Sequence, residues 1–162
     1  VLQGVLALDP PFDRAEWRQI YSQQVNLIRQ DPQGMLVLSA RTLSADPDLV
    51  PIGARRLMIL LRRLALREGT TYVFESNDSR LRRRIEGKFR RLLTDLFQRG
   101  AFAGTTAAES FRVSTGPSVN TRESIDHGEL IVELRVAPSK PLSFLVVKLY
   151  QKDFEGLQVE GS

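Results

Sequence analysis

The sequence predicts an α/β (α+β) protein in which helices pack on a small mixed β-sheet, with extended arms at both ends of the chain. Two observations favour this class. Two long segments have apolar residues at steps of three and four, and several short runs of β-branched and aromatic residues are bounded by Pro, Gly or Asp. Such an order of helices and strands is typical of helices packed against a sheet. The 162 residues, 42% of them hydrophobic, are enough for one domain with a core.

The first third of the chain predicts a short helix followed by a β-hairpin. An apolar, extended stretch ends at Pro10 and Pro11. The segment FDRAEWRQIYSQQ then opens with Asp13, a good N-cap residue, and predicts a helix. The segments VNLIRQ and MLVLSART flank DPQG, a turn with Pro second and Gly last, and therefore predict two paired strands.

Two long helices are predicted in the middle of the chain. Residues 51–68 begin with Pro at the first helical position and are followed by a glycine. Residues 78–99, with Asn77 or Asp78 as the cap, have a regular apolar stripe and are also followed by a glycine. Between the helices, the β-rich residues 71–75 predict a buried strand of the sheet.

The last third predicts three strands, in SFRVST, ELIVELRVA and PLSFLVVKLY. The residues after Tyr150 are polar and have too little apolar surface to fold alone. We therefore divide the chain into three parts. Residues 1–22 form an N-terminal arm and short helix that lead from a missing upstream region, residues 23–150 form a core domain, and residues 151–162 form a C-terminal tail.

The positive charge of the protein is concentrated in its middle third. Residues 51–100 carry 13 basic and 5 acidic side chains, a net charge of +8. Residues 1–50 and 101–162 each have a net charge of −2, so the basic character belongs to the two predicted helices. Nearly all of these cations are Arg, which binds carboxylates as readily as phosphates.

Three interpretations of the basic helices stay open on the residues alone. The first is a pair of solvated helix faces, which is what most charge runs are. The second is a nucleic-acid-binding module that uses helices 51–68 and 78–99, but such modules interleave basic residues with exposed aromatic ones. Here Phe89 and Phe97 lie on or beside the apolar stripe instead. The third is a surface that binds an acidic protein.

The sequence shows no catalytic, metal or cofactor motif. The single histidine, His127, has Ser124 and Asp126 beside it, but the members of a catalytic triad converge from separate elements. Asp46 and Asp48 flank a proline, a pattern that more often starts a turn than binds a metal. The chain has no Cys, and no P-loop or dinucleotide fingerprint occurs in it. We therefore predict no enzyme activity, no cofactor and no metal.

Five short motifs occur in an order and spacing known from one protein family. They are ARTLS at 40–44, RRL at 55–57 with GT at 69–70, VFE and ND within 73–78, GAFAG at 100–104, and VAP and KP within 136–141. Together they resemble the C-terminal domain of contractile tail sheath proteins, found in contractile-tailed phages, R-type pyocins and extracellular contractile injection systems. The resemblance covers about residues 23–150. Ser39 and Ser76 depart from it, since they replace the usual Gly and Pro.

The resemblance implies a structural subunit of a sheath that polymerises around an inner tube and contracts to drive the tube through a target envelope. The implied partners are further copies of the subunit in hexameric rings stacked helically, an inner tube protein, and baseplate and terminator proteins. Neither nucleic acid nor a membrane is expected as a partner. The sheath is expected to assemble in the bacterial cytoplasm, as part of a phage virion or a phage-tail-like particle.

Two surfaces become candidates for function. The resemblance implies that this domain lies against the tube, and we expect the tube to be contacted by Arg80, Arg82, Arg83, Arg84, Arg90 and Arg91. Exposed ion pairs contribute about 0–1 kcal/mol each, so many copies give firm but releasable binding. The second surface is a strand with two apolar faces, which is expected to pair with strands of neighbouring subunits. It consists of Phe144, Leu145, Val146, Val147, Lys148 and Leu149.

Overall fold

The chain forms two compact units, Val1–Arg55 and Arg56–Ser162. Their coordinates come from a computed structural model, which describes residues 2–8, 13–72, 75–140, 143–152 and 156–161. The boundary between the units lies inside the predicted core of 23–150, and the three-part division of the chain stays a prediction.

The first unit contains the predicted N-terminal helix, α1 (Arg14–Ser22). The Asp13 carboxylate accepts the backbone N–H of Glu16 at 2.8 Å, and the Glu16 carboxylate accepts the backbone N–H of Asp13 at 2.8 Å. This reciprocal pair is a capping box, which satisfies amide groups that the first turn of a helix leaves unpaired. The predicted helix and its cap are confirmed.

The predicted hairpin is also present in the first unit. Strands β1 (Ile28–Asp31) and β2 (Gly34–Val37) pair antiparallel across the predicted turn. Gly34 ends that turn with a φ of 120°, a value that favours glycine. Leu27 and Met35 are the buried apolar residues of the hairpin. A short 3-10 helix, η1 (Pro47–Leu49), follows in the loop after β2.

The two basic helices form where the sequence predicts them, as α2 (Ile52–Gly69) and α3 (Ser79–Gln98). Asp78 is the N-cap of α3, and its carboxylate accepts the N–H of Leu81 at 2.6 Å. This hydrogen bond lowers the pKa of Asp78. Gly100, with a φ of 75°, follows the end of α3. None of the helices in the described ranges is long and apolar enough to cross a bilayer.

The second unit has a four-stranded sheet in the order β3-β4-β5-β6. Its strands are β3 (Phe111–Ser114), β4 (Leu130–Val136), β5 (Leu145–Lys152) and β6 (Gly156–Gly161), and two short helices, α4 (Ala107–Ser110) and α5 (Arg122–Asp126), lie between them in sequence. The expectation of a mixed sheet is wrong, because all the pairs between these strands are antiparallel. Successive strands are neighbours here, so the chain returns directly rather than crossing over.

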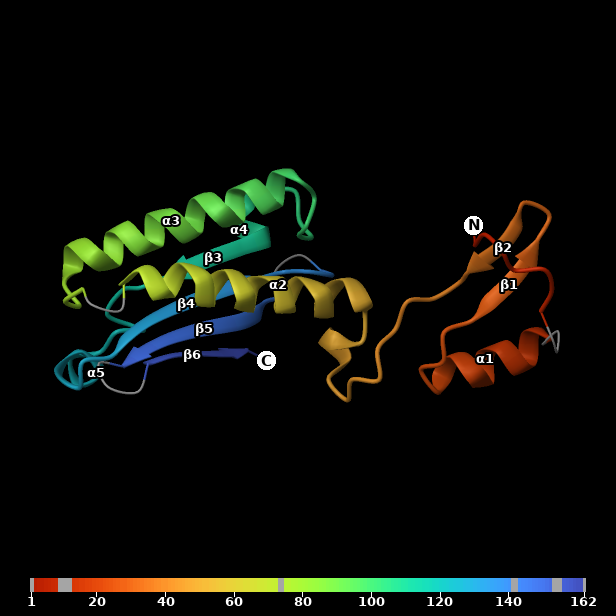
Figure 1. The fold of residues 1–162 in the computed structure, drawn as a ribbon, viewed down its shortest axis with the longest axis horizontal. Coiled ribbons are helices and arrows are strands. Elements are labelled where there is room, and N and C mark those ends of the chain that lie inside the picture. The colour runs from red at the N-terminus through yellow and green to blue at the C-terminus, as the bar shows by residue number, and fades with distance from the viewer. Residues whose placement is uncertain (1, 9–12, 73–74, 141–142, 153–155, 162) are drawn as a thin grey trace. The chain divides into compact units, whose positions relative to one another are not determined.

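The predicted strand at 71–75 is also wrong. Thr70–Tyr72 forms a 3-10 helix, η2, and residues 73–74 lie outside the described residues. Both α2 and α3 cover the same face of the sheet (Figure 1), so the chain turns back between them instead of crossing the sheet. Tyr72 is buried at this turn, and its carbonyl accepts a hydrogen bond from the Gln151 side chain at 2.9 Å.

The core of the second unit lies between the helix layer and one face of the sheet. Successive residues of a strand point to opposite faces of the sheet. Val132 and Leu134 of β4 are two residues apart, so both face the helices, and both are buried. The helices contribute Leu61 from α2 and Phe89 from α3, which are 0% and 1% exposed. This two-layer arrangement confirms the predicted fold class of helices packed on a sheet.

Candidate functional surfaces

The strand predicted to pair with neighbouring subunits, β5, is an inner strand of the sheet. It pairs with β4 along one edge and with β6 along the other. Val147 and Leu149 are buried on the helix side, whereas Val146 and Lys148 are half-buried on the other side. Phe144 precedes the strand and lies beneath the Arg112 guanidinium, 5.3 Å from its ring centroid. Pairing of residues 144–149 between subunits stays a prediction, and it requires β6 to leave β5.

β6 is held in place by two contacts with α2. Arg62 donates a hydrogen bond through Nη2 to the carbonyl oxygen of Gly161. A Cβ on Gly69 would lie 2.8 Å from a methyl carbon of Leu157, so a larger residue there would require the Leu157 side chain to shift. The Nε atom of Arg62 is buried and has no hydrogen-bond partner among the described residues. The sequence pattern indicates only a helix stop at Gly69 and does not indicate a role for Arg62.

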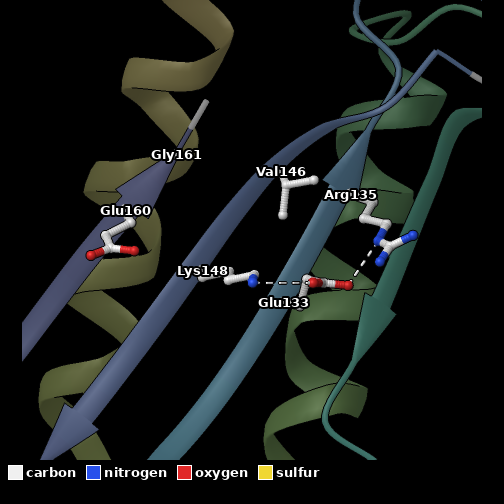
Figure 2. Close-up of a pocket in the computed structure, with 6 residues that line it drawn as sticks. All are labelled: Glu133, Arg135, Val146, Lys148, Glu160 and Gly161. Atoms are coloured by element: carbon white, nitrogen blue, oxygen red, sulfur yellow. Dashed lines mark hydrogen bonds and ion pairs between the residues drawn. The ribbon is translucent and has the colours of Figure 1, made fainter. Parts of the chain in front are cut away.

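The face of the sheet turned away from the helices carries a row of charged side chains (Figure 2). Glu133 on β4 accepts a hydrogen bond from Arg135 at 2.7 Å and lies 3.9 Å from Lys148 Nζ on β5. Its side chain is only 9% exposed, so two cations neutralise a largely buried carboxylate. Together with Glu160 and Gly161 of β6, these residues line a hollow of about 530 Å³. The carboxylate at its centre is therefore already paired.

Three of the six predicted tube-contact arginines are free to bind a partner. Arg80, Arg83 and Arg91 are exposed, and their guanidinium groups form no hydrogen bond or ion pair with any other described residue. Their spacing places them on the face of α3 opposite its buried residues. Gly87 lies on the same face, and a Cβ added there would meet nothing within 4 Å. We call Arg80, Arg83 and Arg91 the α3 arginine ridge.

Two further predicted arginines are engaged near the start of α3. Arg82 is half-buried and donates a hydrogen bond to the side-chain oxygen of Asn77 at 2.8 Å. Arg84 forms an ion pair with Glu75, and its guanidinium lies 5.5 Å from the centroid of the Tyr72 ring. The Glu75 carboxylate raises the pKa of Arg84. Both side chains fix the turn that leads into α3, so they are less available to a partner.

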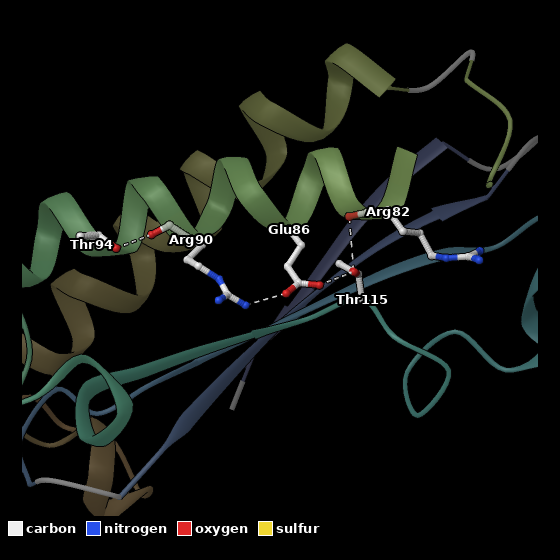
Figure 3. A network of polar contacts seen from close by, with 5 residues as sticks. All are labelled: Arg82, Glu86, Arg90, Thr94 and Thr115. Carbon is white, nitrogen blue, oxygen red and sulfur yellow. Dashed lines mark hydrogen bonds and ion pairs between the residues drawn. The ribbon is translucent and has the colours of Figure 1, made fainter. Parts of the chain in front are cut away.

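Arg90, the sixth predicted arginine, belongs to a polar network between α3 and the end of β3 (Figure 3). Its Nη2 atom donates to Glu86 Oε1 at 2.7 Å. The other carboxylate oxygen of Glu86 accepts from the Thr115 hydroxyl at 3.0 Å. Thr115 is only 3% exposed, so the network continues into the protein. No sequence pattern indicates this role of Thr115, because it depends on a contact with Glu86, 29 residues away along the chain.

A second charged cluster joins the two basic helices. Lys88 of α3 forms an ion pair with Glu68 of α2, and Arg67 lies 3.4 Å from the other oxygen of that carboxylate. The hydrogen bond between Lys88 and Glu68 lowers the pKa of Glu68 and raises the pKa of Lys88, because it stabilises the charged form of each group. Four other arginines of α2 add to the positive surface, and Arg56 and Arg63 among them are exposed.

The residues considered for catalysis or metal binding do not converge. His127 is exposed and ends α5, and the Ser124 hydroxyl donates to the Thr121 carbonyl rather than to the histidine. Asp46 caps η1 by accepting the N–H of Asp48 at 2.9 Å. Across the part of the chain that the structure describes, no three His, Cys, Asp or Glu side chains are grouped to hold a metal ion.

The fold is similar to sheath and baseplate chains of contractile systems. The protein matches a chain of the anti-feeding prophage baseplate and a chain of the anti-feeding prophage helical sheath in its contracted state, each with a TM-score of 0.76 and 28% identity. It also matches a chain of the PVC sheath complex, an extracellular contractile injection system, in its contracted state, with a TM-score of 0.70 and 28% identity.

These matches cover 87% of this chain, which spans 40% of the two anti-feeding prophage chains and 39% of the PVC chain. No protein-family model matches the chain, and no curated protein matches it. The matched structures include sheath complexes and a baseplate. This fold, and the 28% identity over most of the chain, confirm the resemblance to contractile tail sheath proteins that the sequence motifs indicate.

Proposed function

We propose that this chain is the tube-facing part of a sheath subunit that polymerises around an inner tube and contracts to drive the tube through a target envelope. The observation that carries this proposal is the similarity, over 87% of the chain, to sheath chains of two contractile systems. The surfaces of the molecule fit a structural role. Arginines that have no hydrogen-bond or ion-pair partner among the described residues lie on exposed helix faces, and β6 is an edge strand of the sheet.

The α3 arginine ridge is suited to a contact that must hold and later release. Arg80, Arg83 and Arg91 can each pair with a carboxylate of the tube without giving up a hydrogen bond or ion pair to a residue that the structure describes. Exposed ion pairs contribute about 0–1 kcal/mol each, so a single contact is weak. Repetition of the contact in every subunit makes the whole sheath bind firmly.

The partners that we propose are further copies of the subunit, an inner tube protein, and baseplate and terminator proteins. The similarity to a chain of the anti-feeding prophage baseplate supports association with a baseplate. We propose that the copies form hexameric rings stacked helically and that assembly takes place in the bacterial cytoplasm. The link between copies that we propose is strand pairing at the β6 side of the sheet, where one copy supplies a strand to the next.

Electron microscopy of co-expressed proteins tests this function. The natural subunit that contains this chain is produced together with its tube protein, and the purified product is imaged. Striated cylinders around a tube are the expected result. Subunits that stay dispersed in the presence of assembled tubes would contradict the proposal.

A further inference from the structure

Large apolar side chains are exposed in only two regions of the chain that the structure describes. One region is α2, where Ile59, Leu60 and Leu66 are 41%, 42% and 39% exposed. The other region is the first unit, Val1–Arg55, which holds all the others. Single exposed apolar residues are ordinary on a protein surface, but residues that gather in two regions indicate surfaces that something covers.

On α2 the exposed apolar residues alternate with arginines along one face. Ile59 and Leu66 are seven residues, or about two turns, apart, and so are Arg56 and Arg63, so these four residues share a face of the helix. The fully buried Leu61 lies on the opposite face. The exposed apolar residues are therefore surplus to the core. We call this surface, which consists of Arg56, Ile59, Leu60, Arg63 and Leu66, the α2 stripe.

In the first unit, one face of the β-hairpin carries a pair of exposed apolar residues. Ile28 and Val37 lie directly opposite each other in the register of β1 and β2, and they are 42% and 53% exposed. Directly opposite residues point to the same face of a hairpin. Arg29, the next residue, points to the other face, where its guanidinium lies 5.7 Å from the centroid of the Trp17 ring of α1. Since α1 contacts that other face, the face with Ile28 and Val37 is open to a partner. We call Ile28 and Val37 the hairpin pair.

The two regions have opposite charge. α2 carries five Arg and one Glu, a net charge of +4, whereas residues 1–50 have a net charge of −2. Arg56 and Arg63 are exposed and have no hydrogen-bond or ion-pair partner among the described residues. In the first unit, Asp13, Glu16 and Asp48 are exposed, and their carboxylates form no ion pair with a described residue. Each region therefore offers unpaired charges that the other can neutralise.

We propose that the α2 stripe of one sheath subunit binds the first unit of a neighbouring copy, with the hairpin pair against Ile59 and Leu66. This inference rests on the proposed function, which brings many copies together. Of the surfaces that the structure describes, the first unit is the one that joins exposed large apolar residues to a negative charge, so it fits the stripe in both respects. The contact is additional to strand pairing at β6. It is also distinct from the α3 arginine ridge, since α3 has no exposed large apolar residue.

Photo-crosslinking in assembled particles tests which molecule covers the α2 stripe. Particles are built from a mixture of isotope-labelled natural subunits and unlabelled subunits in which p-benzoylphenylalanine replaces Ile59, and the crosslinked peptides are identified by mass spectrometry. We expect crosslinks from position 59 to labelled peptides from residues 21–43. The same substitution at Gln158, an exposed residue on the outer face of the sheet, is the control and should give no crosslinks to these peptides.

Several outcomes of this experiment would overturn the inference. Crosslinks only to unlabelled first units would mean that the contact lies within one chain. Crosslinks to the tube or to another part of the natural subunit would assign the α2 stripe to a different occupant, and their absence although particles form would leave the stripe uncovered. If the unaltered subunit forms no particles, the proposed function is wrong instead.

A double-mutant cycle tests whether the two surfaces touch each other. Ile59→Gln/Leu66→Gln and Ile28→Thr/Val37→Thr each remove the apolar contact from one side with residues suited to a helix and to a strand. Circular dichroism first establishes that the variants are folded. We expect each variant to raise the critical concentration for sheath assembly about fivefold, and the combined variant to raise it about fivefold as well, because either change alone already breaks the same contact.

The control for this cycle combines Ile59→Gln/Leu66→Gln with Arg83→Glu/Arg91→Glu, which alters a separate surface. In this combination the two increases in critical concentration should multiply, because the changes affect independent contacts. If the increases also multiply for the α2 stripe and the hairpin pair, or if the folded variants assemble like the unaltered subunit, the inference is wrong.

Discussion

Gly87 lies in the interior of α3 with a helical backbone, and the space above it is open. Glycine at such a position is less stable than alanine by about 0.5–1 kcal/mol, because the unfolded chain loses more freedom on folding. We therefore expect Gly87→Ala to raise the free energy of unfolding by about 0.5–1 kcal/mol, as measured by urea denaturation. The added methyl group lies between the arginines of the α3 arginine ridge. If Gly87→Ala raises the free energy of unfolding but prevents sheath assembly, a partner must approach residue 87 closely.

Gly100 supplies the matched control, because its φ of 75° is a conformation that residues with a Cβ rarely adopt. Gly100→Ala should lower the free energy of unfolding, by about 1 kcal/mol or more. Opposite signs for the two substitutions would show that backbone conformation decides the outcome. If both Gly87→Ala and Gly100→Ala lowered the free energy of unfolding, the conclusion that a methyl group fits at residue 87 would be wrong.

The ion pair between Glu68 and Lys88 gives stability a dependence on pH. Because the folded state lowers the pKa of Glu68, its contribution is present above the pKa of the unfolded chain and is lost as the pH falls through the folded value. The raised pKa of Lys88 means that the same pair also weakens at strongly alkaline pH. We expect Glu68→Gln to reduce stability at neutral pH and to leave it less sensitive to acid. Thermal melts from pH 3 to 7 check this, with Glu123→Gln, an exposed residue of α5, as the control. If the melting temperature of Glu68→Gln falls with decreasing pH as it does in the unaltered protein, this ion pair does not cause the acid sensitivity.

At the scale of an element, α3 offers a direct test of the arginines that contact the tube. Arg83→Glu/Arg91→Glu reverses two charges that have no partner in the described chain, so the fold should persist while binding to tubes falls. The difference in tube binding between this variant and the unaltered protein should become smaller as the salt concentration is raised, because salt also screens the arginine contacts of the unaltered protein. Co-sedimentation with tubes at several salt concentrations measures this.

Arg90→Glu is the matched control for α3, because Arg90 is already paired with Glu86. This change places two carboxylates next to each other and should lower stability more than it lowers binding to tubes. If Arg90→Glu weakens binding as strongly as the double reversal does, the distinction between free and engaged arginines is wrong.

The elements that the sequence predicts correctly are those defined by local signals. Asp13 and Asp78 cap their helices, and the DPQG turn sets the hairpin. The segment at 70–75 has β-branched and aromatic residues, but its place between two helices on one face of the sheet overrides that preference. β6 is polar and becomes ordered through β5, Arg62 and Gly69, none of which is adjacent to it in sequence.

The candidate site divides in the same way. Helical periodicity is enough to place the arginines on the outside of α3, but it does not tell Arg83 from Arg90. That difference comes from Glu86 and from Thr115, which reaches α3 from the end of β3. The exposure of Ile59, Leu60 and Leu66 on α2 also has no sequence signature, because leucine and isoleucine in a helix normally indicate its buried face.

At the scale of the whole molecule, removal of residues 153–162 tests the role of the chain end in assembly. It takes away β6 and leaves the edge of β5 open, whereas the core between the helices and β3, β4 and β5 stays. We expect a folded protein that assembles poorly, as judged by circular dichroism and electron microscopy of the natural subunit carrying this truncation. Sheaths of normal length and stability would remove the chain end from the links between subunits.

A truncation two residues earlier separates folding from assembly. Removal of residues 151–162 also deletes Gln151, whose buried side chain donates to the Tyr72 carbonyl at the turn between the basic helices. An unpaired buried carbonyl costs about 1–3 kcal/mol, so this shorter protein should melt at a lower temperature than the one that ends at Lys152. Equal melting temperatures would show that the turn does not depend on Gln151.

The four-stranded sheet has two unlike edges, β3 with four residues and β6 with six. If copies join by laying the β6 edge of one against a different edge of the next, the contact is head-to-tail and has no twofold axis. Such a contact does not end at a dimer; it closes into a ring or continues as a helix, depending on the rotation between copies. The resulting polymer has a direction, with a different unfilled edge at each end. The contact between subunits then does not determine the length of the polymer, so a separate structure must set where growth begins and where it stops.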